Sequence, residues 1–482
     1  MFIRPSFLLV FLTRLATACL DHEDLVKSHI QTKINKTADP CTDFYAHVCP
    51  SNLPLNQTVG ERLRQLYLQE AAKFHTKHDE FTKQIYTYVH NFRKVVNDLI
   101  EVCEITGDNK SLAIDFVNQT TRIAFNESSS CEAIGYTFGL SAFMLDPYEL
   151  YGLLLDICFF GPRELEFSKS DLGHLLNKNE EKFMNSFKDE VRKKFLETPW
   201  LKNKNGTEVY LEFLENDFSL FKKTENIIHS WEKIFDDLEN YSKSCKPNNT
   251  ISSFVCAIEK LIALVRKKAR PSFEFTMFEP SLNAGNLENE IKINRATQLL
   301  TLTDNMARLY GSYGFIVGHE VMHSFYSSGK DDNRLKDYWT DSSQCVGEQY
   351  TATCNEFGNE DCLPAGTDKT NEEDGSDLAS IRVVYSDFQK NYLHNEKSDI
   401  DGITSEQMFF YAFASMWCTP RMFAFGNPVD VHSGPYIRVN ALLAQMDEFK
   451  EAFQCAENSR MVKSKVEHCS IFRSGCAANQ KE

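Results

Sequence analysis

The pentapeptide His319-Glu320-Val321-Met322-His323 is the feature that most constrains this chain. On an α-helix, positions i and i+4 lie on one face, so both imidazoles can reach the same metal ion. Glu320 lies about 100° further round the helix, where it can contact a metal-bound water without being a ligand itself. Zinc is the expected metal, because neutral imidazoles suit it and because it lowers the pKa of bound water towards ~7.

The residues before this motif argue against a chance match on an exposed helix. Phe315, Ile316 and Val317 precede it directly, and a fully exposed helix would not carry three consecutive apolar residues. We therefore interpret the motif as a metal site on a partly buried helix.

A catalytic zinc site needs a third protein ligand and an open fourth position. The metzincin arrangement is excluded, because Tyr326 and Gly329 stand where it requires glycine and histidine. A later helix offers an acid instead, since Glu373 and Asp377 are four residues apart and share a face. One of them could bind the metal while the other accepts the free N–H of a ligand histidine. Acids in a first helical turn also occur simply to complement the helix dipole.

Cysteine content and the N-terminus indicate export. Fifteen cysteines among 482 residues are typical of an oxidising compartment. Residues 1–20 combine a basic start, a largely apolar run and the small-residue triplet Ala16-Thr17-Ala18, so we predict a cleaved signal peptide and a secreted product. Arg14 interrupts the run, which is shorter than the roughly 20 apolar residues that span a bilayer. An uncleaved membrane anchor is therefore the less favoured alternative.

Glycosylation sequons and net charge bear on the partners of the chain. The acceptor asparagines of the eight sequons are Asn35, Asn56, Asn109, Asn118, Asn126, Asn205, Asn240 and Asn248. All precede residue 250, so we expect N-linked glycans on the front half. A net charge of −16 argues against a nucleic-acid partner.

Apolar periodicity predicts a mainly α-helical chain with two domains. Apolar residues recur at spacings of three and four, which is typical of buried helix faces, over residues 85–103, 214–238 and 258–265. The pattern changes after Lys268. We therefore place a boundary near residue 270, with an N-terminal helical region at 21–270 and a second domain at 271–482.

Two shorter segments are interpreted from their local pattern. Apolar residues alternate at 273–277 and again at 291–293, which predicts a short β-hairpin or a pair of edge strands. Polar residues dominate from Ser327 to Asp374, and we interpret that stretch as a long loop before helices resume.

Several segments resemble one known family and follow each other in the family's order. Tyr313–Phe325 looks like the zinc helix of the neprilysin and endothelin-converting-enzyme family of zinc metalloendopeptidases. The other matching segments are Asp39–Cys49, Leu335–Thr340, Cys345–Tyr350, Glu373–Tyr385, Phe409–Cys418, Asp430–Ser433 with Arg438, and Glu451–Cys455. The resemblance is strong at 38–49 and from about 275 to 482, and thin through the helical middle.

The family's fold would make the chain a two-domain gluzincin. The resemblance implies a mainly α architecture with a thermolysin-like catalytic core, a small β edge sheet and a reduced helical lid domain. Residues 38–60 would pack on the catalytic domain, which we expect at 271–482.

The resemblance also implies one zinc ion per chain. His319, His323 and Glu373 would bind the zinc, and Glu320 would be the general base that activates the attacking water. Asp377 would orient a ligand histidine.

Further residues would act on the substrate. By resemblance, His432, held by Asp430, would stabilise the oxyanion, and Arg438 would bind a substrate carbonyl or carboxylate. The substrate would lie as an added strand along the pair Asn283 and Ala284. Candidates for the apolar pocket after the scissile bond are Phe315, Ile316, Met416 and Trp417, for which plain core packing is the alternative.

Disulfide pairing can be carried over in the same way. The family pattern would join Cys41 with Cys455, Cys49 with Cys418, and Cys345 with Cys469. The first two would tie the front of the chain to the catalytic half. A local bridge between Cys354 and Cys362 is a further possibility.

The departures from the family define the alternative hypothesis. Glu-Asp-Gly-Ser-Asp at 373–377 replaces Glu-Asn-Ile-Ala-Asp, Gly285 stands where the family has an aromatic, and the helical middle is shorter. The expected function is a secreted zinc-dependent endopeptidase that cleaves extracellular peptides before apolar residues. The alternative is a secreted, catalytically inactive peptide-binding glycoprotein derived from such an enzyme.

Overall fold

The structure is a computed structural model of the whole chain. It describes residues 24–74, 161–197, 282–287, 290–331, 336–358, 369–426 and 430–466, together with 114, 233, 236, 468, 469, 471 and 472. The three long apolar stripes of the front half lie outside the described residues apart from positions 233 and 236, and the candidate signal peptide lies wholly outside them.

The chain divides into two compact units. The first comprises residues 1–66, 175–221 and 281–482, and the second comprises 67–174 and 222–280. The first unit therefore takes in residues 175–221 as well as the segment with the metal motif. The domain limits expected from the sequence, at residues 20 and 270, remain predictions.

The described part of the second unit is helical. It contains α10 (Gly161–Ser168), the end of α4 (Val59–Ala71) and the start of α11 (Asp171–Glu197). Tyr67 donates a 2.5 Å hydrogen bond to the buried carboxylate of Glu164. This bond links the end of α4 to α10.

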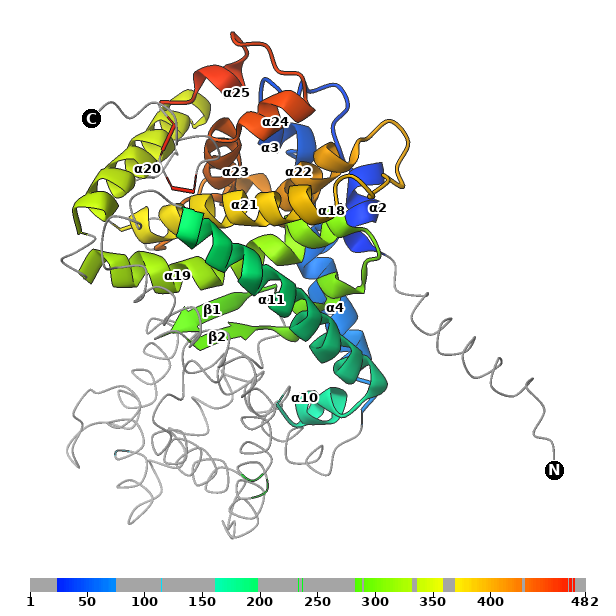
Figure 1. Cartoon of the computed structure of the whole chain (residues 1–482). Coiled ribbons are helices and arrows are strands. Elements are labelled where there is room, and N and C mark those ends of the chain that lie inside the picture. The colour runs from blue at the N-terminus through cyan, green and yellow to red at the C-terminus, as the bar shows by residue number, and fades with distance from the viewer. Residues whose placement is uncertain are drawn as a thin grey trace. The chain divides into compact units, whose positions relative to one another are not determined.

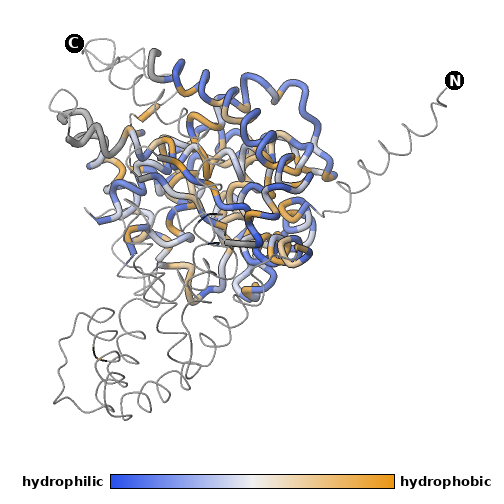
Figure 2. The backbone as a smooth tube through the Cα atoms, turned by 90° about the horizontal axis from the view of Figure 1, so that it is seen from below, coloured by the Kyte–Doolittle hydropathy of each residue, from blue (hydrophilic) through white to orange (hydrophobic). Residues whose placement is uncertain are grey.

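The first unit is built mostly of helices (Figure 1). The helices that lie wholly within it are, in chain order, α2 (Leu25–Thr32), α3 (Phe44–Val48), η1 (Leu55–Gln57), α17 (Arg295–Gln298), η6 (Leu299–Leu302), α18 (Met306–Leu309), the π-helical η7 (Tyr310–Gly314), α19 (Phe315–Asp331), α20 (Lys336–Phe357), α21 (Asn371–Asn391), α22 (Ser405–Met416), η8 (Arg421–Phe423), α23 (Pro435–Ala444), α24 (Asp447–Ala452) and α25 (Arg460–Lys463). Hydrophobic stretches alternate with hydrophilic ones along the chain (Figure 2). The expected mainly α fold is confirmed.

A two-stranded antiparallel sheet accompanies the helices. It consists of β1 (Ala284–Leu287) and β2 (Glu290–Ile293), with Ala284 opposite Ile293 and Leu287 opposite Glu290. The predicted alternation at 291–293 is the second strand of this hairpin. The alternating segment at 273–277 lies outside the described residues, and β1 begins later.

The core forms where α19 and the preceding turn η7 meet α21 and α22. Gly318 permits a close approach, because a β-carbon there would lie 2.5 Å from Oγ of Ser380 on α21. Gly311 does the same for α22, since its β-carbon would lie 2.3 Å from the carbonyl oxygen of Phe409. Ser380 donates a 2.8 Å hydrogen bond to the carbonyl of Phe315. Small side chains therefore let the helix that carries the metal motif lie directly on its neighbours.

Disulfide bonds tie the front of the chain to its C-terminal half. Bonds join Cys41 to Cys455, Cys49 to Cys418, and Cys345 to Cys469, which confirms the three predicted pairs. Phe44 between the first two is fully buried and packs on Tyr411, Phe449 and Phe453. Cys354 is also disulfide-bonded, and its suggested partner Cys362 lies outside the described residues.

The long loop predicted from Ser327 to Asp374 is wrong. Helix α19 continues to Asp331, and α20 occupies 336–357. The buried positions of α20 do recur at helical spacing, namely Cys345, Val346, Gln349, Tyr350, Thr353 and Phe357. Two of them are polar, and Gln349 satisfies its amide through Thr353, the carbonyl of Ser464 and Gln445. A search for apolar periodicity misses a helix whose buried face contains hydrogen-bonded polar side chains.

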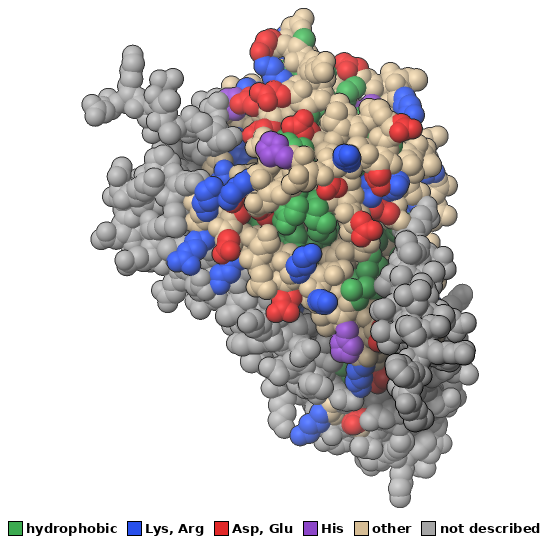
Figure 3. Space-filling view, turned by 45° about the vertical axis from the view of Figure 1, so that its right-hand side comes forward, with side chains coloured by type: hydrophobic (Ala, Val, Ile, Leu, Met, Phe, Trp, Pro, Cys, Tyr) green, Lys and Arg blue, Asp and Glu red, His purple; other side chains and the backbone are tan. Residues whose placement is uncertain are grey.

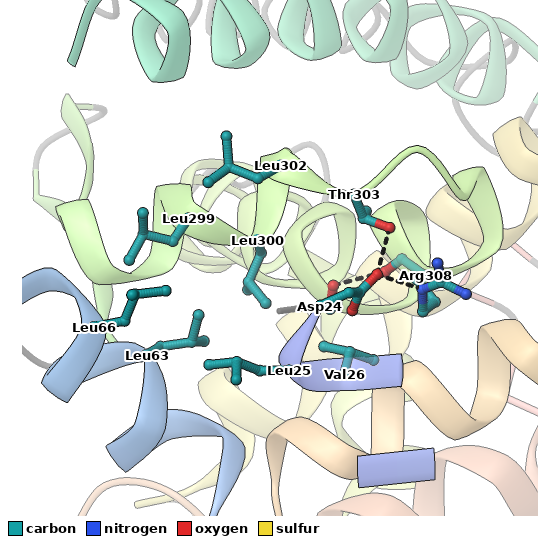
Figure 4. Close-up of a pocket in the computed structure, with 11 residues that line it drawn as sticks. Asp24, Leu25, Val26, Leu63, Leu66, Leu299, Leu300, Leu302, Thr303 and Arg308 are labelled. Atoms are coloured by element: carbon teal, nitrogen blue, oxygen red, sulfur yellow. Dashed lines mark hydrogen bonds and ion pairs between the residues drawn. The ribbon is translucent and has the colours of Figure 1, made fainter. Parts of the chain in front are cut away.

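An ion cluster holds the start of α2. Asp24 caps this helix and pairs with Arg308 at 2.7 Å, and Arg308 also pairs with Asp399. Leucine side chains of α4 and η6 surround a hollow beside this cluster (Figure 4). Asp24 there accepts hydrogen bonds from Thr303 and Arg308. We interpret this hollow as part of the interface where α2 packs on α4 and η6.

Two features of the surface concern possible partners. Among the described residues, no helix is long and apolar enough to cross a membrane. On the face in Figure 3, basic and acidic side chains are interspersed.

His29 on α2 should make stability depend on pH. It is 2% exposed, and its Nε2 lies 3.0 Å from the carbonyl oxygen of Val48. Burial lowers the pKa of His29 to about 4, so the folded chain keeps it neutral while the unfolded chain protonates below about 6.5. The free energy of unfolding should therefore be fully present above pH 6.5 and fall as the pH drops towards 4.

Urea unfolding at pH 7 and pH 4.5 tests this expectation. His29→Gln keeps an N–H donor for Val48 but does not titrate, so the wild type should lose roughly 2–3 kcal/mol more than the variant over this interval. Equal losses in both proteins would contradict the assignment.

Candidate metal centre

Helix α19 positions the two histidines of the motif. His319 and His323 are one turn apart on the same face, and their rings meet edge to face with centroids 4.5 Å apart. Glu320 lies between them in sequence and is 6% exposed. The π-helical turn η7 runs directly into this helix, and such irregular turns are often found next to functional sites.

Helix α21 brings Glu373 to the same place. The helix begins at Asn371, so Glu373 lies in its first turn, and it runs unbroken through Gly375 and Ser376. The contact between α19 and α21 described above sets how closely Glu373 approaches the histidines.

Three donor atoms converge at this point. Nε2 of His319 lies 3.0 Å from Nε2 of His323, and Oε2 of Glu373 lies 3.1 and 3.2 Å from these two nitrogens. Ligands at roughly 2.0–2.1 Å from a tetrahedral zinc are about 3.3 Å apart. The spacing of the three donors therefore matches a zinc site that leaves a fourth position for water or substrate.

The tautomer of His319 also fits a metal. Its Nδ1 lies 2.8 Å from Oδ1 of Asp377, so the ring proton belongs on Nδ1 and the Nε2 lone pair faces the centre. The Nδ1 of His323 lies 3.4 Å from Oγ of Ser376. Because two imidazole nitrogens and a carboxylate oxygen face one another, a cation between them is the arrangement that their chemistry favours.

Asp377 lies at the middle of a buried charge network. Arg438 donates to both of its oxygens at 2.7 Å, and Asp377 itself is 0% exposed. The guanidinium of Arg438 also lies 4.0 Å from the ring centroid of Trp417. Arg438 therefore fixes the carboxylate behind His319. Its expected contact with the substrate remains a prediction.

His432 is the third imidazole at the centre. Its Nε2 lies 3.1 Å from Oε2 of Glu373, and its Nδ1 lies 2.7 Å from Oδ1 of Asp430. Donor atoms of His319, Glu373 and His432 all fall within 4.8 Å of one another. With 40% of its side chain exposed, His432 can face both the centre and an incoming ligand.

Burial and neighbouring charges shift the pKa values of these groups. Burial alone would raise the pKa of Glu373, but its bonds to the three imidazoles hold that pKa far below the ordinary value. Burial would also raise the pKa of Asp377, yet Arg438 and His319 lower it to about 2. Burial raises the pKa of Glu320. At neutral pH Glu373 and Asp377 are therefore anionic, as ligands and their partners must be.

Residues of the edge strand lie against the motif helix. Asn286 on β1 donates from its amide to the carbonyl of Glu320 at 2.5 Å and to Oγ of Ser324 at 2.7 Å. Asn283 is exposed and Ala284 is half-buried. This bond aligns the strand with the helix position that carries Glu320.

The predicted apolar residues lie beside the motif. Phe315 is buried and packs on Phe413 and Trp417, with centroid distances of 4.7 and 5.9 Å. Ile316, Met416 and Trp417 are half-buried. Their assignment to a substrate pocket remains a prediction.

Sequence analysis missed several side chains that support the centre, namely Asn286, Asp374, Ser376 and Ser433. Oδ2 of Asp374 accepts hydrogen bonds from the hydroxyls of Thr370 and Ser433. Burial, followed by the charge of Asp377, raises the pKa of Asp374 to about 8. The only signal in the sequence was proximity, since all four lie within three residues of an assigned position.

The segment around the centre matches a family of known proteins. The model of peptidase family M13 matches residues 298–469, which contain the three converging donors. The expected resemblance to the neprilysin and endothelin-converting-enzyme family is confirmed over this segment.

Individual M13 proteins resemble parts of the chain. Neprilysin-1 of Caenorhabditis elegans is 31% identical over 178 residues, which is 32% of this chain and 22% of that protein. Endothelin-converting enzyme 1 of Cavia porcellus is 30% identical over 217 residues, which is 40% of this chain and 28% of that enzyme. The matches thus span only about a quarter of these relatives' length.

A solved M13-type structure shows a similar fold. The zinc metalloprotease Zmp1 of Mycobacterium tuberculosis, crystallised with an inhibitor, superposes with a TM-score of 0.50 and 12% identity. The superposition covers 90% of this chain and 98% of that one. It supports the fold assignment.

Asp377→Asn should weaken metal binding through His319. The carboxylate of Asp377 accepts from both Arg438 and Nδ1 of His319, and a neutral asparagine side chain cannot replace this anion. Zinc affinity should therefore fall about 10–100-fold. Removing the buried charge should also cost about 3 kcal/mol of stability. Competition titration against a chelator measures the affinity.

Asp387→Asn is the matched control, because Asp387 is a buried aspartate on the same helix that accepts instead from Tyr310 and Asn391. It should lower stability and leave zinc affinity within about twofold of the wild type. Equal loss of zinc affinity in both variants would overturn the role of Asp377.

Proposed function

We propose that this chain is a secreted zinc-dependent endopeptidase that cleaves extracellular peptides on the N-terminal side of apolar residues. The observation that carries the proposal is the convergence of His319, His323 and Glu373 within 3.2 Å of one another. The match of residues 298–469 to peptidase family M13 supports it, because that family consists of peptidases.

The proposed metal set is His319, His323 and Glu373, with one zinc ion per chain. Bound zinc would polarise the scissile carbonyl and acidify the attacking water. Glu320 would accept the proton of that water and later deliver it to the leaving amine. The raised pKa of Glu320, caused by its burial, suits this role because the ideal pKa of such a base lies close to the working pH.

His432 would stabilise the charge that develops on the carbonyl oxygen. Asp430 holds its Nδ1 at 2.7 Å and orients Nε2 towards the centre. The pKa of His432 is raised, since Glu373 and Asp430 outweigh the effects of burial and Arg438. A protonated imidazole donates a charge-assisted hydrogen bond to an oxyanion.

The peptide would extend the sheet at its edge. Asn283 and Ala284 would bind it as an added strand beside β1, which Asn286 fixes to the carbonyl of Glu320. Phe315, Ile316, Met416 and Trp417 would form the pocket after the scissile bond. Arg438 has donors beyond those bound to Asp377 and would reach a substrate carbonyl.

Secretion rests on the cysteines and the N-terminal sequence. The three disulfides among described residues suit an oxidising compartment. The sequons of the front half would carry N-linked glycans, and residues 1–20 would be removed as a signal peptide.

Glu320→Gln tests the mechanism. The amide keeps the shape but cannot accept a proton, so kcat should fall about 10²–10⁴-fold while the zinc content stays at one per chain. The assay is cleavage of a peptide library, followed by mass spectrometry, beside elemental analysis for zinc.

Glu348→Gln, at an exposed position on α20, is the control and should leave cleavage unchanged. Unchanged activity of Glu320→Gln would refute the proposed base. A wild-type protein that binds zinc and peptides but cleaves none would instead support the inactive binding glycoprotein.

A further inference from the structure

Asp374 connects two parts of the candidate centre. It directly follows the ligand Glu373, and it is 0% exposed. Its Oδ2 accepts one hydrogen bond from Oγ1 of Thr370 at 2.9 Å and one from Oγ of Ser433 at 3.0 Å. The first bond stays within the start of α21, and the second crosses to the segment that carries His432.

Among the described residues, backbone packing and side-chain bonds hold the segment around His432. On its C-terminal side Gly434 lies against the backbone of Phe425, where a β-carbon would come within 2.3 Å. His432 is bonded through Asp430, which is itself 48% exposed. Ser433, in contrast, is 5% exposed and bonded to a buried group.

The bond between Asp374 and Ser433 lies next to the candidate centre in both segments. Ser433 follows His432 and Asp374 follows Glu373 in the sequence. Nε2 of His432 lies 3.1 Å from Oε2 of Glu373. The Asp374–Ser433 bond therefore runs alongside the His432–Glu373 contact and limits how far the imidazole can move.

We propose that Asp374 and Ser433 form a positioning pair that holds His432 at the metal-binding carboxylate of Glu373. This inference rests on the proposed function, in which His432 stabilises the oxyanion. Neither residue touches substrate; both act through the imidazole and the ligand beside them.

Ser433→Ala and Thr370→Val form a matched pair for the test. Each removes one hydroxyl donor from the same oxygen of Asp374, but only the first releases the His432 segment. Ser433→Ala should lower kcat about tenfold with little change in KM, and Thr370→Val should stay within about twofold. Asp374→Ala should match Ser433→Ala, and Asp374→Asn should recover most of the lost kcat because it restores an acceptor.

A second measurement does not depend on cleavage. Carbethoxylation of His432 by diethyl pyrocarbonate, followed by peptide mass spectrometry on the zinc-loaded protein, reports how freely the imidazole moves. The rate should rise several-fold in Ser433→Ala and Asp374→Ala, and remain at the wild-type value in Thr370→Val.

The two arms separate the possible failures. A wild type that cleaves no peptide refutes the proposed function, while the labelling rates still test the positioning pair. Equal labelling rates in Ser433→Ala, Thr370→Val and the wild type would overturn the positioning pair, whatever the activity.

Discussion

The close contact of α19 with α21 is the constraint on which the candidate centre depends. A zinc site of this kind needs donors from separate helices within about 3.3 Å of each other, and side chains alone cannot correct a poor helix spacing. Gly318 supplies the room, and Ser380 ties the two backbones together. The imidazoles of one helix and the carboxylate of the other then meet without further adjustment.

Behind the donors, the fold provides the buried charges that orient them. Arg438 neutralises Asp377, and Asp377 fixes the tautomer of His319. Removing either partner would leave an uncompensated charge in the core, which is strongly destabilising. The same helix turn also carries Asp374, so one segment holds both the proposed metal ligand Glu373 and residues that support it.

How far the sequence predicts this molecule depends on the kind of signal. The geometry of the histidine motif can be predicted from the sequence, because residues i and i+4 lie on the same face of a helix. The third ligand and the disulfide pairs came from resemblance, since spacing alone leaves both open. Helix α20 was missed because Gln349 and Thr353 take positions in its buried stripe. The Asp374–Ser433 hydrogen bond could not be predicted. It joins residues 59 apart, and a single hydrogen bond leaves no periodic pattern in the sequence.

The most direct test is the position of the metal itself. Crystals of the zinc-loaded protein, measured on both sides of the zinc absorption edge, should give one anomalous peak per chain. The account predicts this peak at roughly 2.0–2.2 Å from Nε2 of His319, Nε2 of His323 and Oε2 of Glu373. A peak bound elsewhere, or a Glu373 side chain turned away from it, would contradict the account.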